Sequence, residues 1–140
     1  IMPSLVGSEM CIRDRYNAIK NSGETALFQQ VIKDISLAKN KLIEDGLHAG
    51  FCLCHGNMGN LLILKRYAEI FDDKQVRSIC DSRFEQILEF LNDQNVLPTE
   101  LYNPGFMTGL SGIAYALLKY TMPELPLIIG VEGIDDRNKD

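Results

Sequence analysis

Cys54, His55 and Gly56 are three consecutive residues whose types could support metal chemistry. A thiolate and a neutral imidazole are preferred ligands of zinc, an ion of borderline softness. Residues adjacent in sequence can bind one ion when they lie on an irregular turn, and Gly56 supplies the backbone freedom for such a turn. An apolar helix is expected to begin directly afterwards, and its N-terminus favours the thiolate form of Cys54. The residues are therefore compatible with a zinc site at the start of a buried helix.

The same pair also allows other interpretations. A buried cysteine beside an unrelated histidine is a frequent coincidence, and the two residues alone do not exclude it. A nucleophile with its base is disfavoured, because adjacent side chains usually point apart. Of the remaining candidates, Cys52 is expected to pack as a small apolar group, Cys80 to lie in the core on a helix stripe, and His48 to be a solvated loop residue.

Four helical segments are expected to position this pair. Residues 25–44 and 74–92 carry apolar side chains at intervals of three and four, which predicts amphipathic helices. Residues 60–71 and 110–120 are apolar on nearly every side, which is typical of buried helices. The alternation predicts an all-α fold in which an outer layer of helices surrounds an inner one.

Glycine, aspartate and proline residues mark the expected ends of these helices. Gly46 is a C-terminal stop for the first helix, and Asp72 or Asp73 is the N-cap of the helix that follows. Pro98 and Pro104 mark residues 95–106 as a loop.

The two buried helices open alike, which indicates an internal repeat. Gly56 and Gly59 precede the first, and Gly109 and Gly112 stand at the same places 53 residues later. A period that holds one outer and one inner helix is typical of helical-hairpin repeats. Glycines three apart at a helix start allow neighbouring backbones to approach closely, so these four are expected to be structural residues around a central cavity.

The repeat also places Met107 and Thr108 at the positions of Cys54 and His55. They could line the same cavity, although packing is the simpler expectation. Asn57 and Asn60 are expected to cap and hydrogen-bond rather than bind substrate.

Composition limits the classes of partner. The 140 residues are 46% hydrophobic and 24% charged, which fits a folded globular chain. A net charge of −5 argues against nucleic acid, and no apolar run is long enough to span a membrane. Four irregularly spaced cysteines indicate reduced thiols and a cytoplasmic location.

The ends of the chain differ from its middle. Residues 1–15 resemble the translation of a sequencing adapter, so Cys11 carries no functional argument; a natural polar leader is the alternative. Residues 16–130 are expected to be the C-terminal part of a longer domain, and residues 131–140 a polar tail.

Two motifs resemble one family. Residues 53–60 read LCHGNMGN, which resembles the Cys-His-Gly motif of the lanthionine synthetase cyclases, the LanC-like family. Residues 103–118 read NPGFMTGLSGIAYALL, which resembles the final motif of that family. The wording around Gly59 and Met107 is most similar to the C-terminal cyclase domain of class II lanthipeptide synthetases, LanM.

This resemblance implies a fold, a metal and a reaction. The family fold is an α/α toroid, which would be incomplete here. Zn²⁺ would be held by Cys54, His55 and a third cysteine from an upstream motif, which is absent from this chain. The family's acid/base histidine and the dehydratase domain of LanM enzymes also lie upstream. The substrate would be a dehydrated precursor peptide, whose cysteine thiols add to dehydroalanine or dehydrobutyrine to form thioether rings. The resemblance implies an enzyme in the intact parent and an inactive fragment here.

Two alternatives remain. One is a LanC-like enzyme that adds glutathione or other thiols to dehydrated residues. The other is a helical-repeat binding module without zinc.

Overall fold

The structure is a computed structural model that describes residues 25–48, 50–93, 99–126 and 128. Within these ranges every regular element is helical, which confirms the all-α prediction. The elements are α2 (Thr25–Lys41), the π-helical turn η1 (Leu42–Gly46), α3 (Asn57–Phe71), α4 (Lys74–Asn92), the 3-10 turn η2 (Thr99–Tyr102) and α5 (Leu110–Thr121).

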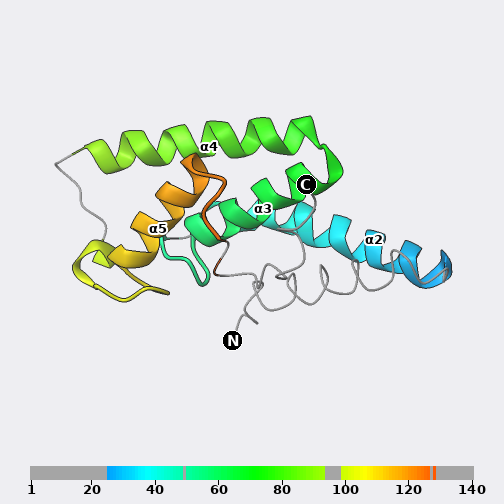
Figure 1. Cartoon of the computed structure of the whole chain (residues 1–140), viewed down its shortest axis with the longest axis horizontal. Coiled ribbons are helices and arrows are strands. Elements are labelled where there is room, and N and C mark those ends of the chain that lie inside the picture. Colours follow the sequence, from blue (N-terminus) through cyan, green and yellow to red (C-terminus); the bar gives the residue numbers. More distant parts are fainter. Residues whose placement is uncertain (1–24, 49, 94–98, 127, 129–140) are drawn as a thin grey trace.

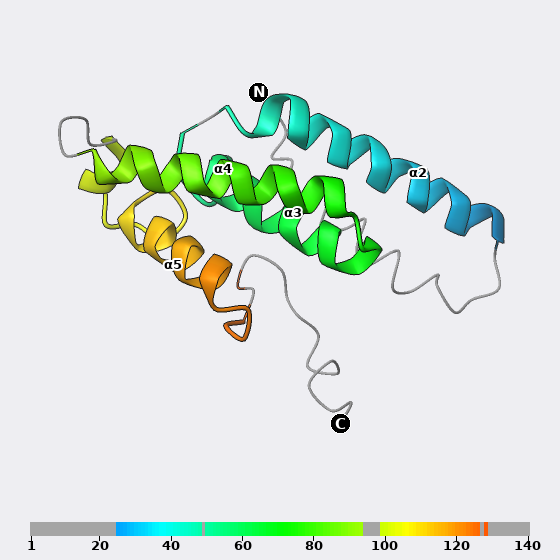
Figure 2. The ribbon, with the colours of Figure 1, turned by 90° about the horizontal axis from the view of Figure 1, so that it is seen from above.

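Helix α3 lies at the centre of the arrangement and contacts α4, α5 and η1. Helix α4 runs along the upper side of both α3 and α5 (Figure 1). Seen from above, α2 and α5 lie on opposite sides of the α3–α4 pair (Figure 2). An outer helix therefore covers two inner ones, in agreement with the predicted alternation.

Helix α4 has the bounds that its sequence predicts. The Asp73 carboxylate accepts a hydrogen bond from the Val76 amide at 3.0 Å and caps the helix N-terminus. The buried stripe consists of Val76, Cys80, Phe84 and Ile87. Burial, followed by the charge of Asp81, raises the pKa of the Cys80 thiol to about 12, so Cys80 is a core group as predicted.

Helix α3 is buried over most of its length, as its apolar sequence predicts. Its buried residues run through the first two turns and recur on the inner face: Asn57, Met58, Gly59, Asn60, Leu61, Leu62, Leu64 and Ala68. Its C-cap is Asp72, which adopts a left-handed conformation with φ of 48°.

The first predicted helix extends slightly further than expected, because the π-helical turn η1 continues it through Gly46.

Helix α5 is buried on one face only, so the prediction of a helix buried all round was wrong. Its inner face holds Gly112, Ile113, Ala116 and Tyr120. On the outer face Leu110 and Leu118 are 46% and 53% exposed. The physical reason is that no described element packs on that face, so its apolar character is not matched by burial.

Tyr120 fixes α5 to its neighbours. Its ring stacks on Phe84 of α4 with centroids 4.0 Å apart, and its hydroxyl donates to Asp81 at 2.7 Å. The Lys65 ammonium of α3 lies 3.8 Å from the ring centroid and also donates to the Tyr120 carbonyl. Three helices thus meet at one side chain, and burial raises the pKa of Tyr120 above its ordinary value.

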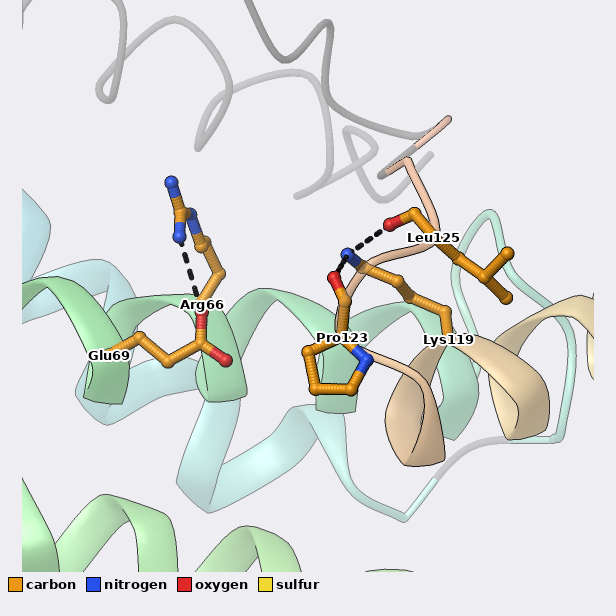
Figure 3. Close-up of polar contacts among 5 residues, drawn as sticks. All are labelled: Arg66, Glu69, Lys119, Pro123 and Leu125. Atoms are coloured by element: carbon orange, nitrogen blue, oxygen red, sulfur yellow. Dashed lines mark hydrogen bonds and ion pairs between the residues drawn. The ribbon is translucent and has the colours of Figure 1, made fainter. Parts of the chain in front are cut away.

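The chain after α5 folds back onto that helix. Lys119 donates to the Pro123 carbonyl at 2.8 Å and to the Leu125 carbonyl (Figure 3). A basic side chain in the last turn commonly satisfies carbonyl groups at a helix C-terminus. The same view includes the ion pair of Arg66 with Glu69 on α3, at 3.3 Å.

Several predictions fall on residues outside the described ranges. These include the segment 1–15 with Cys11 and the tail 131–140. Among the described helices, none combines the length and the apolar character that a membrane crossing needs.

The internal repeat is present in three dimensions as a repeated close approach of backbones. A Cβ atom on Gly59 would lie 1.8 Å from the Leu53 carbonyl oxygen, and one on Gly112 would lie 1.8 Å from the Phe106 oxygen. Gly59 and Gly112 are 53 positions apart, and so are their contact residues Leu53 and Phe106. Each inner helix therefore begins against the loop that leads into it, and only glycine fits at the point of contact.

Hydrogen bonds repeat with the same offset. The Asn57 amide donates to the Gly50 carbonyl at 2.6 Å, and the Leu110 amide donates to the Asn103 carbonyl at 2.7 Å. Gly56 and Gly109, the two N-cap residues, are both extended and lack side-chain caps. The loops before α3 and α5 are two copies of one local structure.

We expect Gly59→Ala and Gly112→Ala each to lower the free energy of unfolding by about 3 kcal/mol, because a methyl group cannot fit against a backbone oxygen. Gly105→Ala is the matched control, since the nearest atom to its Cβ is the Asn103 side-chain oxygen at 3.0 Å, which can move. Urea unfolding followed by circular dichroism measures the difference. Equal losses in all three variants would contradict the close-approach argument.

Candidate metal centre

Cys54 and His55 lie in the tight turn between η1 and α3. The Gly56 amide closes this turn by donating to the Cys52 carbonyl at 3.1 Å. Cys54 Sγ and His55 Nδ1 are 2.7 Å apart, which is hydrogen-bond distance. The irregular turn that the sequence predicts therefore brings both potential ligand atoms to one place directly before the α3 N-terminus.

The second copy of the loop holds this turn in position. The amides of Leu53 and Cys54 both donate to the Met107 carbonyl, each at 3.1 Å. Met107 is the repeat equivalent of Cys54, so the two loops are joined at matching positions. The backbone of a predicted ligand is thus fixed by a residue more than fifty positions away.

Asn103 organises the loop that contains Met107. Its side-chain oxygen accepts from the Gly105 amide at 2.9 Å, and its amide nitrogen donates to the Thr108 hydroxyl at 3.0 Å. Its carbonyl accepts from Leu110 at the start of α5. No individual role was predicted for Asn103, although an asparagine before Pro-Gly is typical of such side-chain turns.

Met107 and Thr108 take part in the hydrogen bonds of the two loops. Met107 contributes its backbone carbonyl, and its side chain is 43% exposed. The Thr108 side chain is also exposed, and its hydroxyl is bonded within its own loop. Neither belongs to the group of potential metal ligands.

The electrostatics of Cys54 differ from the prediction. The helix N-terminus was expected to favour the thiolate, yet the pKa of Cys54 is raised above its ordinary value. Partial burial is the largest cause, and the hydrogen bond with Cys52 is the next. Burial and the neighbouring Cys52 thiol therefore outweigh the backbone hydrogen bonds that lower this pKa.

Cys52 lies beside the pair. It is 4% exposed, as expected for a small apolar group, but its Sγ is 3.8 Å from that of Cys54. The ligand atoms of Cys52, Cys54 and His55 all lie within 4.8 Å of one another. Among the described residues these three form a group able to hold a metal ion.

Asn57 and Asn60 are buried beneath this turn, each 3% exposed. Asn60 donates its side-chain amide to the Gly46 carbonyl at 2.7 Å and so ties the end of η1 to α3. This hydrogen-bonding role agrees with the prediction. For Asn57 the described bond is that of its backbone amide to Gly50.

His48 is exposed, as predicted. It lines a shallow hollow of about 420 Å³ between η1 and α4, together with residues such as Leu47 and Arg83. The hollow shares no residue with the group formed by Cys52, Cys54 and His55. The predicted site and the surface hollow are therefore separate features.

Comparison with known proteins agrees with the two motifs. The family model described as lanthionine synthetase C-like protein matches residues 12–132. The chain belongs to this family. The match includes both repeated loops, so the predicted relationship to LanC-like proteins is confirmed.

One curated relative is the lacticin 481/lactococcin biosynthesis protein LcnDR2 of Lactococcus lactis subsp. lactis. It is 38% identical over 96 residues, which cover 64% of this chain and 10% of the relative. The chain therefore spans about a tenth of the length of that relative. No solved structure matches the chain significantly.

We expect Asn103→Ala to speed amide hydrogen exchange at Leu53 and Cys54 by about tenfold, because loss of the side-chain turn loosens the Met107 carbonyl that holds both amides. Asn40→Ala, an exposed substitution on α2, is the control. Exchange measured residue by residue separates the two. Unchanged protection at Leu53 and Cys54 in the Asn103 variant would show that the loops are not coupled in this way.

Proposed function

We propose that this chain is part of a zinc-dependent lanthipeptide cyclase of the LanM class. Its Cys54 and His55 would hold Zn²⁺ at the start of α3. The substrate would be a dehydrated precursor peptide, in the cytoplasm. A cysteine thiol of that peptide would add to the β-carbon of dehydroalanine or dehydrobutyrine, and a proton would then be delivered to the α-carbon to complete a thioether.

The observation that carries this proposal is the close pairing of Cys54 Sγ and His55 Nδ1 in a turn held by backbone hydrogen bonds. One sulfur and one imidazole nitrogen are a donor set that suits zinc. The family match and the identity with a lantibiotic biosynthesis protein support the same interpretation.

The surroundings of the pair suit a site that receives a peptide. His55 is exposed and Cys54 is half-buried, so the pair can be reached from solvent, whereas Leu53 and Met58 on either side are almost completely buried. When bound, Zn²⁺ would lower the pKa of an incoming thiol and so supply a thiolate at neutral pH. The protein residues would orient that thiol and hold the turn rigid during the addition.

The chain carries only part of the machinery that this function requires. A third cysteine ligand, the acid/base histidine and a dehydratase domain are expected in the longer parent protein. The alternating layers of α2, α3, α4 and α5 would then form one sector of an α/α toroid. The chain alone is expected to be inactive as a cyclase.

The metal is tested first, by zinc analysis of the purified chain after equilibration with Zn²⁺. We expect Cys54→Ala to hold markedly less zinc than the unsubstituted chain, because Cys54 supplies one of the two ligands that this chain contributes. Cys80→Ala is the matched control because Cys80 is buried in the core, away from the turn. Equal zinc content in the Cys54 and Cys80 variants would refute the metal site.

The reaction is tested in a chimera in which the matching segment of the Lactococcus relative is replaced by the corresponding residues of this chain. We expect the chimera to consume the free thiols of a dehydrated precursor peptide and the Cys54→Ala chimera to leave them free. Thiol alkylation followed by mass spectrometry reads the outcome. Addition of glutathione in place of ring closure would favour the alternative thiol-addition enzyme, and a chimera that binds the peptide without zinc would favour the binding module.

A further inference from the structure

The hollow between η1 and α4 combines an apolar floor with an uncharged polar rim. Its volume is about 420 Å³, and its apolar lining comes from Ile43, Leu47 and Ile79. On the α4 side it is lined by three polar residues spaced four apart, Ser78, Ser82 and Gln86. Side chains at this spacing form one row along a helix, and hydroxyl and amide groups both donate and accept hydrogen bonds. The row therefore suits the amides and carbonyls of an extended peptide backbone.

This polar row is uncharged, whereas the neighbouring row on the same helix is charged throughout. The neighbouring row consists of four exposed residues at the same spacing, Arg77, Asp81, Glu85 and Glu89. Depletion of charged side chains is typical of the centre of protein interfaces. The composition of α4 on the side of the hollow is therefore that of a surface that contacts a partner.

Arg83 gives the hollow a positive charge without an acidic neighbour in its lining. The guanidinium donates to the Leu47 carbonyl at 2.5 Å and to the Gln86 side-chain oxygen at 2.8 Å, and both acceptors are neutral. Glu44 and Asp45 of η1 do not line the hollow. The Nε atom of Arg83 is buried and has no hydrogen-bond partner in the described structure. Because a guanidinium has five N–H groups and pairs best with a carboxylate, the hollow is suited to an acidic ligand.

The polar row leads from the hollow toward the turn that holds Cys54 and His55. Four positions beyond Gln86 the same row reaches Phe90, whose ring stacks on Phe51 with centroids 5.1 Å apart. Phe51 directly precedes the turn. Between Ser78 and Phe90 the helix rises about 18 Å, a distance that about five or six residues of extended peptide span. A short peptide on this row would thus extend from the hollow to the side of the turn.

We propose that the hollow and its polar row bind the precursor peptide, with Arg83 pairing with a glutamate or aspartate side chain of that peptide. The apolar floor accepts an adjacent apolar side chain, and the row on α4 pairs with the peptide backbone. This proposal rests on the proposed function for the nature of the substrate. It deepens that function, because it names the side chain that is recognised away from the reacting thiol. Charge complementarity is the reason that the peptide is acidic, and Arg83 takes no part in the addition itself.

The test is a titration of the isotope-labelled chain with an acetylated and amidated peptide, Gly-Ala-Leu-Glu-Ala-Gly, followed by amide correlation NMR. We expect the backbone signals of Leu47, Ser82 and Gln86 to shift. The matched peptide with glutamine in place of glutamate should bind at least about tenfold more weakly, because it loses a charge-assisted hydrogen bond. Equal affinities for the two peptides, or shifts confined to residues outside the hollow, would overturn the proposal. Sodium acetate is the third probe, and acetate that binds as tightly as the peptide would overturn it in favour of a small free carboxylate.

Two variants test the role of the positive charge. Arg83→Met removes the guanidinium, and Ser82→Glu adds a negative charge to the exposed row while the hydrogen bonds of Arg83 stay in place. We expect each to weaken binding of the glutamate peptide by about tenfold or more. Arg77→Met, which removes a charge from the neighbouring row, is the matched control and should bind like the unsubstituted chain. An equal loss in the Arg77 variant would reduce the effect to general electrostatics and overturn the site.

Zinc content separates this proposal from the proposed function. Both Arg83→Met and Ser82→Glu are expected to hold as much zinc as the unsubstituted chain, because the hollow shares no residue with the turn. Normal zinc content without peptide binding at the hollow would overturn the peptide site alone. Peptide binding at the hollow by a chain that takes up no zinc would support the peptide site and overturn the zinc-dependent cyclase.

Discussion

The close contact between each inner helix and the loop before it is the constraint on which the rest of this structure depends. Gly59 rests on the Leu53 carbonyl and Gly112 on the Phe106 carbonyl, at distances that exclude any side chain. These contacts bend the preceding loop back under the helix start, where its amides and carbonyls bond to the helix and to the other loop. Without them neither loop could form the tight turn that leads into α3 or α5. The two copies thus support one another through a shared backbone carbonyl, that of Met107.

The two copies of the loop have different roles in this arrangement. The first loop carries sulfur and imidazole groups, and the second carries Met107 and Thr108 at the equivalent positions, where one contributes a backbone acceptor and the other an internal hydrogen bond. The second loop therefore supports the first. The outer helix α4 completes the support, because it packs across α3 and holds α5 through Phe84 and Asp81. A site made of adjacent residues on a loop gains its rigidity from elements that carry no ligand.

Much of this could be predicted from the sequence, where the signal is local. The spacing of apolar residues and the cap at Asp73 predicted α4 with its bounds, and the glycine spacing predicted the repeated close approach. The partner in that approach was not predictable, since a loop carbonyl has no side-chain signal. The exposure of α5 could not be predicted from its own sequence, because it depends on which elements pack against the helix. The raised pKa of the Cys54 thiol was not predictable either, because it depends on the burial of that thiol in the folded turn. The contact between Cys52 and Cys54 likewise needed the fold, because residues two apart on an extended strand lie on one face but about 6.6 Å apart, and the turn brings the two sulfur atoms closer than that.

The most direct test of the account is zinc-edge X-ray absorption of the zinc-loaded chain. We expect sulfur ligands at about 2.3 Å together with imidazole nitrogen at about 2.0 Å, as a site built on Cys54 and His55 requires. A shell of oxygen and nitrogen atoms without sulfur would contradict it, because zinc would then be bound somewhere other than the turn before α3.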